Sequence, residues 1–365
     1  MTSVGLLQGD QIVFLRHIQV RPGTVLLVSS VLAILAVLSG ILSLASGSVP
    51  IKLITTLQIL FKTVGIPVSS EANASEGVII LQLRLPRVLL AASVGAGLSI
   101  AGVVFQAMFR NPLAEPYILG ISSGGTFGAL VALGAIPLAA FKLVRAVSLP
   151  IASLSGALIV MTVVYVLGQK RGKIEPNRLL LTGVMVGAFF NALILVLIVL
   201  MEKQYRNAFM WLMGNLSEAT YPSVWIVMSV LLIVSGLIFL QAHRYNLIAM
   251  GEETARHLGV ETERLKRVSY FLASVLTGVV VSASGVIGFV GLVVPHICRR
   301  LFGPDHRMLI PAAFFGGATF LILADLVARL ILSPMELPVG VVTAFIGAPV
   351  FVTLLRKSPP EGGNE

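Results

Sequence analysis

Long uninterrupted blocks of apolar residues are the feature that most restricts how this chain can fold. A helix needs about 20 residues to cross roughly 30 Å of hydrocarbon. Eight blocks are close to that length, and they cover residues 24–45, 88–109, 117–137, 148–168, 179–201, 223–241, 308–330 and 337–355. Backbone polar groups in lipid must be satisfied within the segment, so the blocks predict an all-α polytopic membrane protein.

Composition favours a membrane protein over a soluble enzyme with an unusually large core. Charged residues make up 12% of the 365 residues and hydrophobic residues 56%, with a mean hydropathy of +0.97. A soluble domain carries about 25% charged residues. The net charge of +10 would suit nucleic acid in a soluble chain. Here the bases flank apolar blocks, which indicates topology signals and contact with membrane lipid, and no nucleic acid partner is expected.

A further uncharged stretch, residues 268–297, is too long for one ordinary helix and too short for two full ones. Lys266 and Arg267 precede it, and Arg299 and Arg300 follow it. The positive-inside rule therefore places both ends in the cytoplasm. We expect one full helix going out and a short, glycine-broken helix returning. This makes ten transmembrane segments with both termini cytoplasmic.

The chain is expected to form one membrane domain. Residues 1–23 hold bases before the first block, which predicts an uncleaved first span behind a cytoplasmic N-terminal extension rather than a signal peptide. Residues 24–357 would form the ten-segment domain, with 242–267 as its cytoplasmic loop. Residues 358–365 are rich in Pro and Gly and predict a disordered tail.

Motif absences argue against an enzyme. The sequence contains no G-x-x-x-x-G-K-[ST] phosphate loop and no H-E-x-x-H. His296 and Cys298 lack neighbours that would complete a metal site, and Cys298 is the single cysteine. We expect no catalytic residues, no metal and no cofactor. An intramembrane lipid-modifying enzyme is the alternative, but no paired carboxylates or Ser/His set accompany a span.

Charged residues within the apolar blocks are costly and usually functional. Asp325 and Arg329 lie four residues apart, on one face of a helix. A packing ion pair, with Arg329 reaching the surface, is the favoured interpretation. The alternative is a proton relay in a proton-coupled secondary transporter that uses Asp325.

Two arginines flank a proline at the outer mouth of the second span, where the positive-inside rule disfavours them. Arg84 and Arg87 in this position suggest a fixed docking point for carboxylates. Snorkelling of both side chains to the interface is the alternative.

The loop 242–267 contains the pattern of a short helix. Glu252, Ala255 and Gly259 fall at helical spacing, Gly251 precedes them, and Gly259 suits a C-terminal cap. Small residues with charged neighbours favour a helix seated in a partner's groove. A helix lying on lipid is the alternative, but the pattern is weakly apolar.

Seven segments carry a family resemblance when they are taken together and in order. They are QLRLPR at 82–87, RNPLAEP at 110–116, GEETARHLG at 251–259, SGVIGFVGLVVPH at 284–296, DHR at 305–307, ADLVAR at 324–329 and ELPVG at 336–340. With these segments the chain resembles the FecCD-type permeases of type II ABC importers, the group that takes up cobalamin, haem and ferric siderophores. The first 80 residues carry little of the resemblance.

The resemblance implies a permease subunit of the bacterial plasma (inner) membrane that is not itself an enzyme. It implies a homodimer with two ATPase subunits inside and an extracytoplasmic substrate-binding protein outside, working by alternating access. The cargo would be an iron complex, haem or cobalamin. Residues implied to meet acidic groups of the binding protein are Arg84, Arg87 and Arg329. Residues implied to couple to the ATPase are Gly251, Glu252, Ala255, Arg256 and Gly259.

The resemblance also implies a cytoplasmic gate and a pathway wall. The gate would contain Asn111, Leu113, Pro176 and Asn177, although relatives often have a small polar residue where this chain has Pro176. The fifth span, residues 179–201, consists mostly of Leu, Val, Gly and Ala with Asn191 among them. That composition suits a weakly contacting wall, and ordinary packing is the alternative.

Overall fold

A computed structural model describes residues 21–47, 49–67, 73–135, 142–200 and 212–357. The predicted extension 1–23 lies almost entirely outside the described residues. The predicted tail 358–365 lies wholly outside them.

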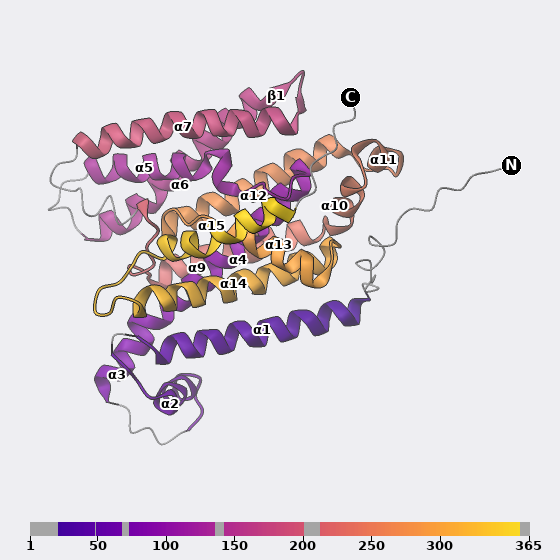
Figure 1. The fold of residues 1–365 in the computed structure, drawn as a ribbon. Helices are drawn as coiled ribbons and strands as arrows, with labels where there is room; N and C mark the ends of the chain where they lie inside the picture. The colour runs from indigo at the N-terminus through magenta and orange to yellow at the C-terminus, as the bar shows by residue number, and fades with distance from the viewer. Residues whose placement is uncertain (1–20, 48, 68–72, 136–141, 201–211, 358–365) are drawn as a thin grey trace.

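The described chain is a bundle of helices with one short hairpin (Figure 1). The first half contains α1 (Pro22–Ala45), α2 (Leu53–Thr63), α3 (Ala74–Val78), the π-helix η1 (Ile79–Arg84), α4 (Leu85–Phe109), the 3₁₀ turn η2 (Pro116–Leu119), α5 (Ile121–Ala135) and α6 (Lys142–Gly168). The second half contains strands β1 (Gln169–Lys170) and β2 (Lys173–Ile174), then α7 (Pro176–Leu200), α9 (Tyr221–Phe239), α10 (Ala242–Ala249), α11 (Glu252–His257), α12 (Thr262–Ser284), α13 (Val290–Phe302), α14 (His306–Leu330) and α15 (Val339–Lys357). The two strands pair antiparallel.

Helices occupy the apolar blocks that the sequence shows. Among the described residues, seven helical stretches are long and apolar enough to cross a membrane: Pro22–Ala45, Ala74–Phe109, Ser148–Gly168, Pro176–Leu200, Tyr221–Phe239, Thr262–Ser284 and His306–Leu330. The blocks 117–137 and 337–355 are occupied by the shorter α5 and by α15. The chain is therefore a mostly helical, multi-pass membrane protein.

The stretch 268–297 divides into a long and a short helix, as expected. α12 ends at Ser284, residues 285–289 form a non-helical connection, and α13 begins at Val290. Gly285 and Phe289 both have a φ of 68°, a left-handed conformation that a helix cannot contain. The break therefore lies within the glycine-rich part of the stretch.

Helix α4 forms the centre of the bundle. Of the most apolar stretch of 18 residues within Ala74–Phe109, 89% is buried. Helices α14, α12, α13 and α9 pack around it. Helix α13 approaches α4 closely because each helix has a glycine at the contact, Gly102 on α4 and Gly291 on α13. A Cβ atom on Gly102 would lie 1.9 Å from the carbonyl oxygen of Gly291. Small residues permit such close packing of membrane helices.

The two ends of the bundle differ in the elements that they carry (Figure 1). At one end, α2 and α3 extend beyond the C-terminal end of α1, and we call this the arginine end. At the opposite end lie α10, α11 and the β1–β2 hairpin, and we call this the loop end. Helix α1 packs on α14 at one edge of the bundle, whereas α7 packs on α5 and α6 at the other.

Candidate functional site

A group of five charged residues, the arginine cluster, connects α1, α4, α14 and the segment after α14 at the arginine end. Its members are Arg84, Arg87, Asp325, Arg329 and Glu336. The structure thus brings together all three arginines that the sequence predicted for docking.

Two of these arginines cap the end of α1. The last carbonyl groups of a helix have no partner within the helix. Arg84 donates to the carbonyl oxygen of Leu44 at 2.7 Å, and Arg329 donates to that of Ser43 at 3.0 Å. Both cations also lie at the negative end of the helix dipole. Arg84 is 7% exposed and Arg329 is 5% exposed, so both guanidinium groups bind partners within the chain rather than at its surface.

The third arginine, Arg87, binds two carboxylates. Its Nε and Nη2 atoms donate to Asp325 Oδ1 at 3.0 and 2.9 Å, and its Nη1 donates to Glu336 Oε2 at 2.7 Å. Asp325 also pairs with Arg329, whose Nε lies 3.2 Å from Oδ2. The Asp325 side chain is 1% exposed, whereas that of Glu336 is 40% exposed. Glu336 is therefore the cluster's acidic group at the surface.

The predicted ion pair of Asp325 and Arg329 is confirmed. The expectation that Arg329 reaches the surface is wrong, because its guanidinium turns to the end of α1, whose carbonyl groups need donors. Asp325 lies between two arginines and forms an ion pair with each of them. These contacts favour a packing role for Asp325 over a proton relay.

At the loop end, a buried lysine connects α11, α12 and the β-hairpin. The Nζ of Lys266 lies 2.6 Å from Glu252 Oε1, 3.1 Å from Glu263 Oε1 and 3.3 Å from the carbonyl oxygen of Ile174. Arg256 also donates to Glu252, at 2.8 Å. Burial alone would raise the pKa of Glu252, but the two cations hold it below its ordinary value. Glu252 and Arg256 are both predicted coupling residues. Glu252 fixes α11 to the start of α12 through Lys266. Arg256 does so through a hydrogen bond to Thr262 Oγ1 at 3.0 Å.

The other predicted coupling residues determine where α11 begins and ends and how it packs, rather than forming its contact surface. Gly251 has a φ of +129° and Gly259 a φ of +82°, conformations that favour glycine at both ends of this helix. Ala255 is fully buried. Two exposed apolar side chains, Met250 (68%) and Leu258 (59%), flank α11 instead. Sequence spacing pointed to this helix but not to those two residues.

Asn246 ties α10 to the start of α14. Its amide donates to Asp305 Oδ1 at 2.8 Å, and its carbonyl oxygen accepts from the backbone N–H of His306 at 2.8 Å. Burial would raise the pKa of Asp305, but hydrogen bonds from Arg307 and Asn246 lower it to about 2. These bonds hold α10 against the start of α14 at the loop end.

The predicted gate residues lie at the C-terminal end of α4 and at the start of α7. Asn111 accepts from the backbone N–H of Leu113 at 2.9 Å, which forms a tight turn directly after α4. Pro176 is the first residue of α7, and Asn177 is exposed. Among the described residues, no hydrogen bond joins the turn to Pro176 or Asn177.

The connection that follows α4 also contacts the break between α12 and α13. A carboxylate oxygen of Glu115 accepts the backbone N–H of Phe289, the residue that precedes α13. Burial raises the pKa of Glu115 to about 7, and the hydrogen bond from Phe289 acts in the opposite direction. Glu115 is thus a carboxyl group with a pKa near neutral pH, and it lies at the break between α12 and α13.

Helix α7 leaves a long apolar face uncovered by the described chain. Of its most apolar stretch of 18 residues, only 17% is buried. Met185, Phe189 and Val196 are 65%, 62% and 56% exposed, and the predicted wall residue Asn191 is also exposed. Either lipid or another protein surface must cover this face.

Besides Met250 and Leu258, three charged residues of these sites were missed by sequence reasoning. Glu336 and Glu115 lie in segments that the sequence singled out, but their partners are 249 and 174 residues away. Lys266 was noted only as a topology signal. Nothing in the sequence pairs such distant groups, so only their segments could be found.

Comparison with known proteins matches these features to one group. The model of the FecCD transport family matches residues 34–357. The chain is 40% identical to the cobalamin import system permease protein BtuC of Halobacterium salinarum, over 85% of this chain and 80% of that protein. It is 37% identical to the hemin transport system permease protein HmuU of Yersinia pestis, over 89% of this chain and 95% of that protein.

Two further matches extend the comparison. The chain is 35% identical to the iron(3+)-hydroxamate import system permease protein FhuG of Bacillus subtilis, over 91% of this chain and 97% of that protein. A solved structure described as an inward-facing conformation of a metal-chelate type ABC transporter superposes with a TM-score of 0.76. It covers 92% of this chain and 100% of its own, at 30% identity.

Proposed function

Because this chain belongs to the FecCD transport family, we propose that it is the permease subunit of an ATP-driven importer for an iron complex, haem or cobalamin. The observation that carries the proposal is the match along nearly the whole chain to permeases named for those three cargoes. The sequence contains no phosphate loop, so ATP would be hydrolysed by separate subunits.

We propose ten transmembrane segments within residues 24–357, with both termini in the cytoplasm and the bacterial plasma membrane as the location. The seven long apolar helices of the described residues, together with α5, α13 and α15, would supply these ten segments. The basic pairs at the two ends of the α12–α13 region support a cytoplasmic loop end. The arginine end then faces outward. Residues 1–23 and 358–365 would be the cytoplasmic extension and tail.

We propose that two copies assemble with their α7 helices facing the transport pathway. The uncovered face of α7 supports this, because its residues are apolar apart from Asn191 and would contact a large cargo weakly. The turn at Asn111 and Leu113 and the start of α7 at Pro176 and Asn177 would narrow the cytoplasmic end when the second copy is present.

We propose that the arginine cluster receives acidic groups of an extracytoplasmic binding protein. Arg87 is the member best suited to meet a carboxylate, because its Nη1 already binds one at the surface. Arg84 and Arg329 would support this role by holding the end of α1 in place.

We propose that the segment from Met250 to Gly259 enters a groove on each ATPase subunit. The exposed Met250 and Leu258 supply apolar contacts outside the spans. The Glu252–Lys266–Glu263 contacts would transmit the movement of α11 to α12, because they connect the two helices at their ends. Closure of the ATPase subunits on ATP would then shift the helices that line the pathway.

Uptake into vesicles tests the proposal. The chain reconstituted with its ATPase and binding protein should import cargo in a manner that requires ATP and is blocked by vanadate. The same chain alone should import nothing. Uptake by the chain alone, driven by a proton gradient and lost in Asp325→Asn, would overturn the proposal in favour of a secondary transporter. The ligand that co-purifies with the binding protein would identify the cargo.

A further inference from the structure

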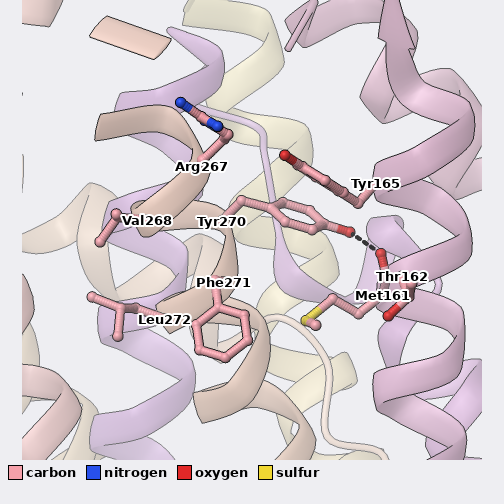
Figure 2. Close-up of a pocket in the computed structure, with 8 residues that line it drawn as sticks. All are labelled: Met161, Thr162, Tyr165, Arg267, Val268, Tyr270, Phe271 and Leu272. Atoms are coloured by element: carbon pink, nitrogen blue, oxygen red, sulfur yellow. Dashed lines mark hydrogen bonds between the residues drawn. The ribbon is translucent and has the colours of Figure 1, made fainter. Parts of the chain in front are cut away.

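A groove between α6 and α12 opens on the surface of the bundle near the loop end (Figure 2). Its volume is about 380 Å³. Apolar and aromatic side chains line it: Met161, Tyr165, Tyr270, Phe271 and Leu272. None of the transport roles proposed above uses this groove.

The floor of the groove is rigid and has its polar atoms satisfied. Tyr270 is 2% exposed, and its hydroxyl donates to the carbonyl oxygen of Met161 at 3.0 Å. Its ring stacks on that of Tyr165 with the centroids 5.8 Å apart. Buried aromatic rings in a stacked pair hold one another in position. The groove is therefore a preformed apolar cavity rather than a gap between loose side chains.

The mouth of the groove carries a cation that the described chain does not neutralise. Arg267 is exposed and forms no ion pair or side-chain hydrogen bond among the described residues, whereas its neighbour Lys266 has three partners. In Figure 2 the hydroxyl of Tyr165 lies on the same side of the groove as Arg267. Together these two groups could donate to one anionic oxygen group.

Further bases lie beyond the groove on the β-hairpin. Lys170, Arg171 and Lys173 are exposed there, and the bond from Lys266 to Ile174 holds the hairpin beside the start of α12. These bases add to the positive charge of Arg267 at this end of the two helices.

The surroundings of the groove belong to the hydrocarbon region. Ile159 and Val166 on α6 and Phe271 on α12 are 59%, 61% and 55% exposed. Both helices belong to candidate membrane spans, and α12 becomes uncharged directly after Arg267. An occupant must therefore be apolar along the groove and negatively charged at its mouth.

We propose that this groove binds one anionic phospholipid, with the phosphate at Arg267 and Tyr165 and an acyl chain against Met161, Phe271 and Leu272. Clusters of bases at the membrane surface attract anionic headgroups. A zwitterionic lipid would fill the groove without using the charge of Arg267. The bound lipid would join α6 to α12 at the end where the ATPase subunits are proposed to act.

Native mass spectrometry of the purified full-length chain tests this proposal. The protein is exchanged into detergent with phosphatidylglycerol or phosphatidylcholine of identical acyl chains. Wild type should retain phosphatidylglycerol preferentially. Arg267→Gln should lower that retention roughly fivefold, because one base near an anionic surface contributes that much.

Arg264→Gln is the matched control, since Arg264 lies on the same helix, is exposed and pairs with Glu261 at 3.7 Å. It should retain lipid as the wild type does. Thr162→Trp tests the cavity itself, because Thr162 is exposed at the edge of the groove and a larger side chain would occupy it. This variant should lose phosphatidylglycerol without loss of thermal stability.

Equal retention of both lipids by the wild type would overturn the proposal. Equal losses in Arg267→Gln and Arg264→Gln would also overturn it, because they would show attraction to general surface charge. Full retention by Thr162→Trp would show that the lipid lies elsewhere.

Discussion

At the scale of single residues, charge pairing decides what the arginine cluster can do. Arg87 is held by a buried carboxylate on one side and by an exposed one on the other. Asp325 is essential to packing, because removing one partner of a buried pair costs about 3–5 kcal/mol. Glu336 is different, because its pair with Arg87 is at the surface and competes with water.

Glu336→Gln should strengthen docking of the binding protein by a few fold, about 0.5–1 kcal/mol. The reason is that the carboxylate of Glu336 occupies the Arg87 atom to which the partner's carboxylate is proposed to bind. Surface binding measurements at low and high salt would detect the gain, which should be larger at low salt.

Glu218→Gln is a matched control, because Glu218 is another exposed acidic residue, in the segment before α9. It should leave docking unchanged. Arg87→Gln should weaken docking, and Arg87→Lys should restore part of it. Weaker docking in Glu336→Gln would show instead that Glu336 positions Arg87 for its partner.

Glu115 should make the stability of the protein depend on pH near neutrality. Its pKa of about 7 lies above the ordinary value of 4.5. The folded state therefore binds the proton more tightly, and this contribution is fully present below about pH 4.5 and lost as the pH rises through about 7. Glu115→Gln should remove that dependence and should be more stable than the wild type at pH 8.

Thermal unfolding of both proteins in detergent between pH 5 and 8 measures this effect. The difference between the two midpoints should grow by a few degrees toward pH 8. Parallel curves for the two proteins would contradict the assignment. Glu115→Ala serves as a comparison, because it also leaves the N–H of Phe289 without an acceptor.

At the scale of elements, the short helix α11 shows how a surface can be built from few residues. Its glycines set the two ends, Glu252 and Lys266 fix it to α12, and Ala255 fills the space beneath it. What remains exposed for a partner combines the apolar side chains of Met250 and Leu258 with polar ones on α11, such as Glu253 and His257. A helix of this kind is stable only through its contacts, since one turn and a half does not form alone in water.

Leu258→Asp should weaken assembly with the ATPase subunits roughly tenfold, because it places a charge in an apolar contact. Co-purification of a tagged ATPase at several salt concentrations would show the loss. Val64→Asp makes a similar change at the arginine end, where Val64 is 79% exposed, and should leave assembly intact. Equal assembly of Leu258→Asp and wild type would exclude this surface.

At the scale of the whole molecule, the bundle has a well-filled centre, and the helices at its two edges, α1 and α7, are largely uncovered by the described chain. Helix α4 is surrounded, while α7 packs on its neighbours along one edge only. Exposed apolar side chains are normal on a lipid-facing helix, so exposure alone does not distinguish lipid from a second copy. A cross-linking measurement can distinguish them.

A single cysteine placed at Val196 on α7 should cross-link two copies through a short bifunctional reagent. The native Cys298 is buried and can be replaced by serine in both proteins. A cysteine at Ile233 on α9, which is 65% exposed, should give monomers under the same conditions. Dimers from Ile233 and none from Val196 would place the contact on the opposite side of the bundle.

The sequence alone determined where the helical segments lie and that residues 268–297 divide into a long and a short helix. Membrane-length apolar blocks, the basic pairs around residues 268–297 and seven ordered motifs depend only on local composition and order, which the chain shows directly. The positions of α12 and α13 followed from them. The three arginines of the arginine cluster also lie in segments that the sequence singled out.

Only the tertiary structure decided what those residues contact. Arg84 and Arg329 turn to the end of α1, Arg87 binds Glu336, and Ala255 is buried while Leu258 is exposed. A buried charge takes the partner that packing brings to it, even when that partner is hundreds of residues away. One sequence without its fold contains no information on such distances, which is why the segments could be predicted and their pairings could not.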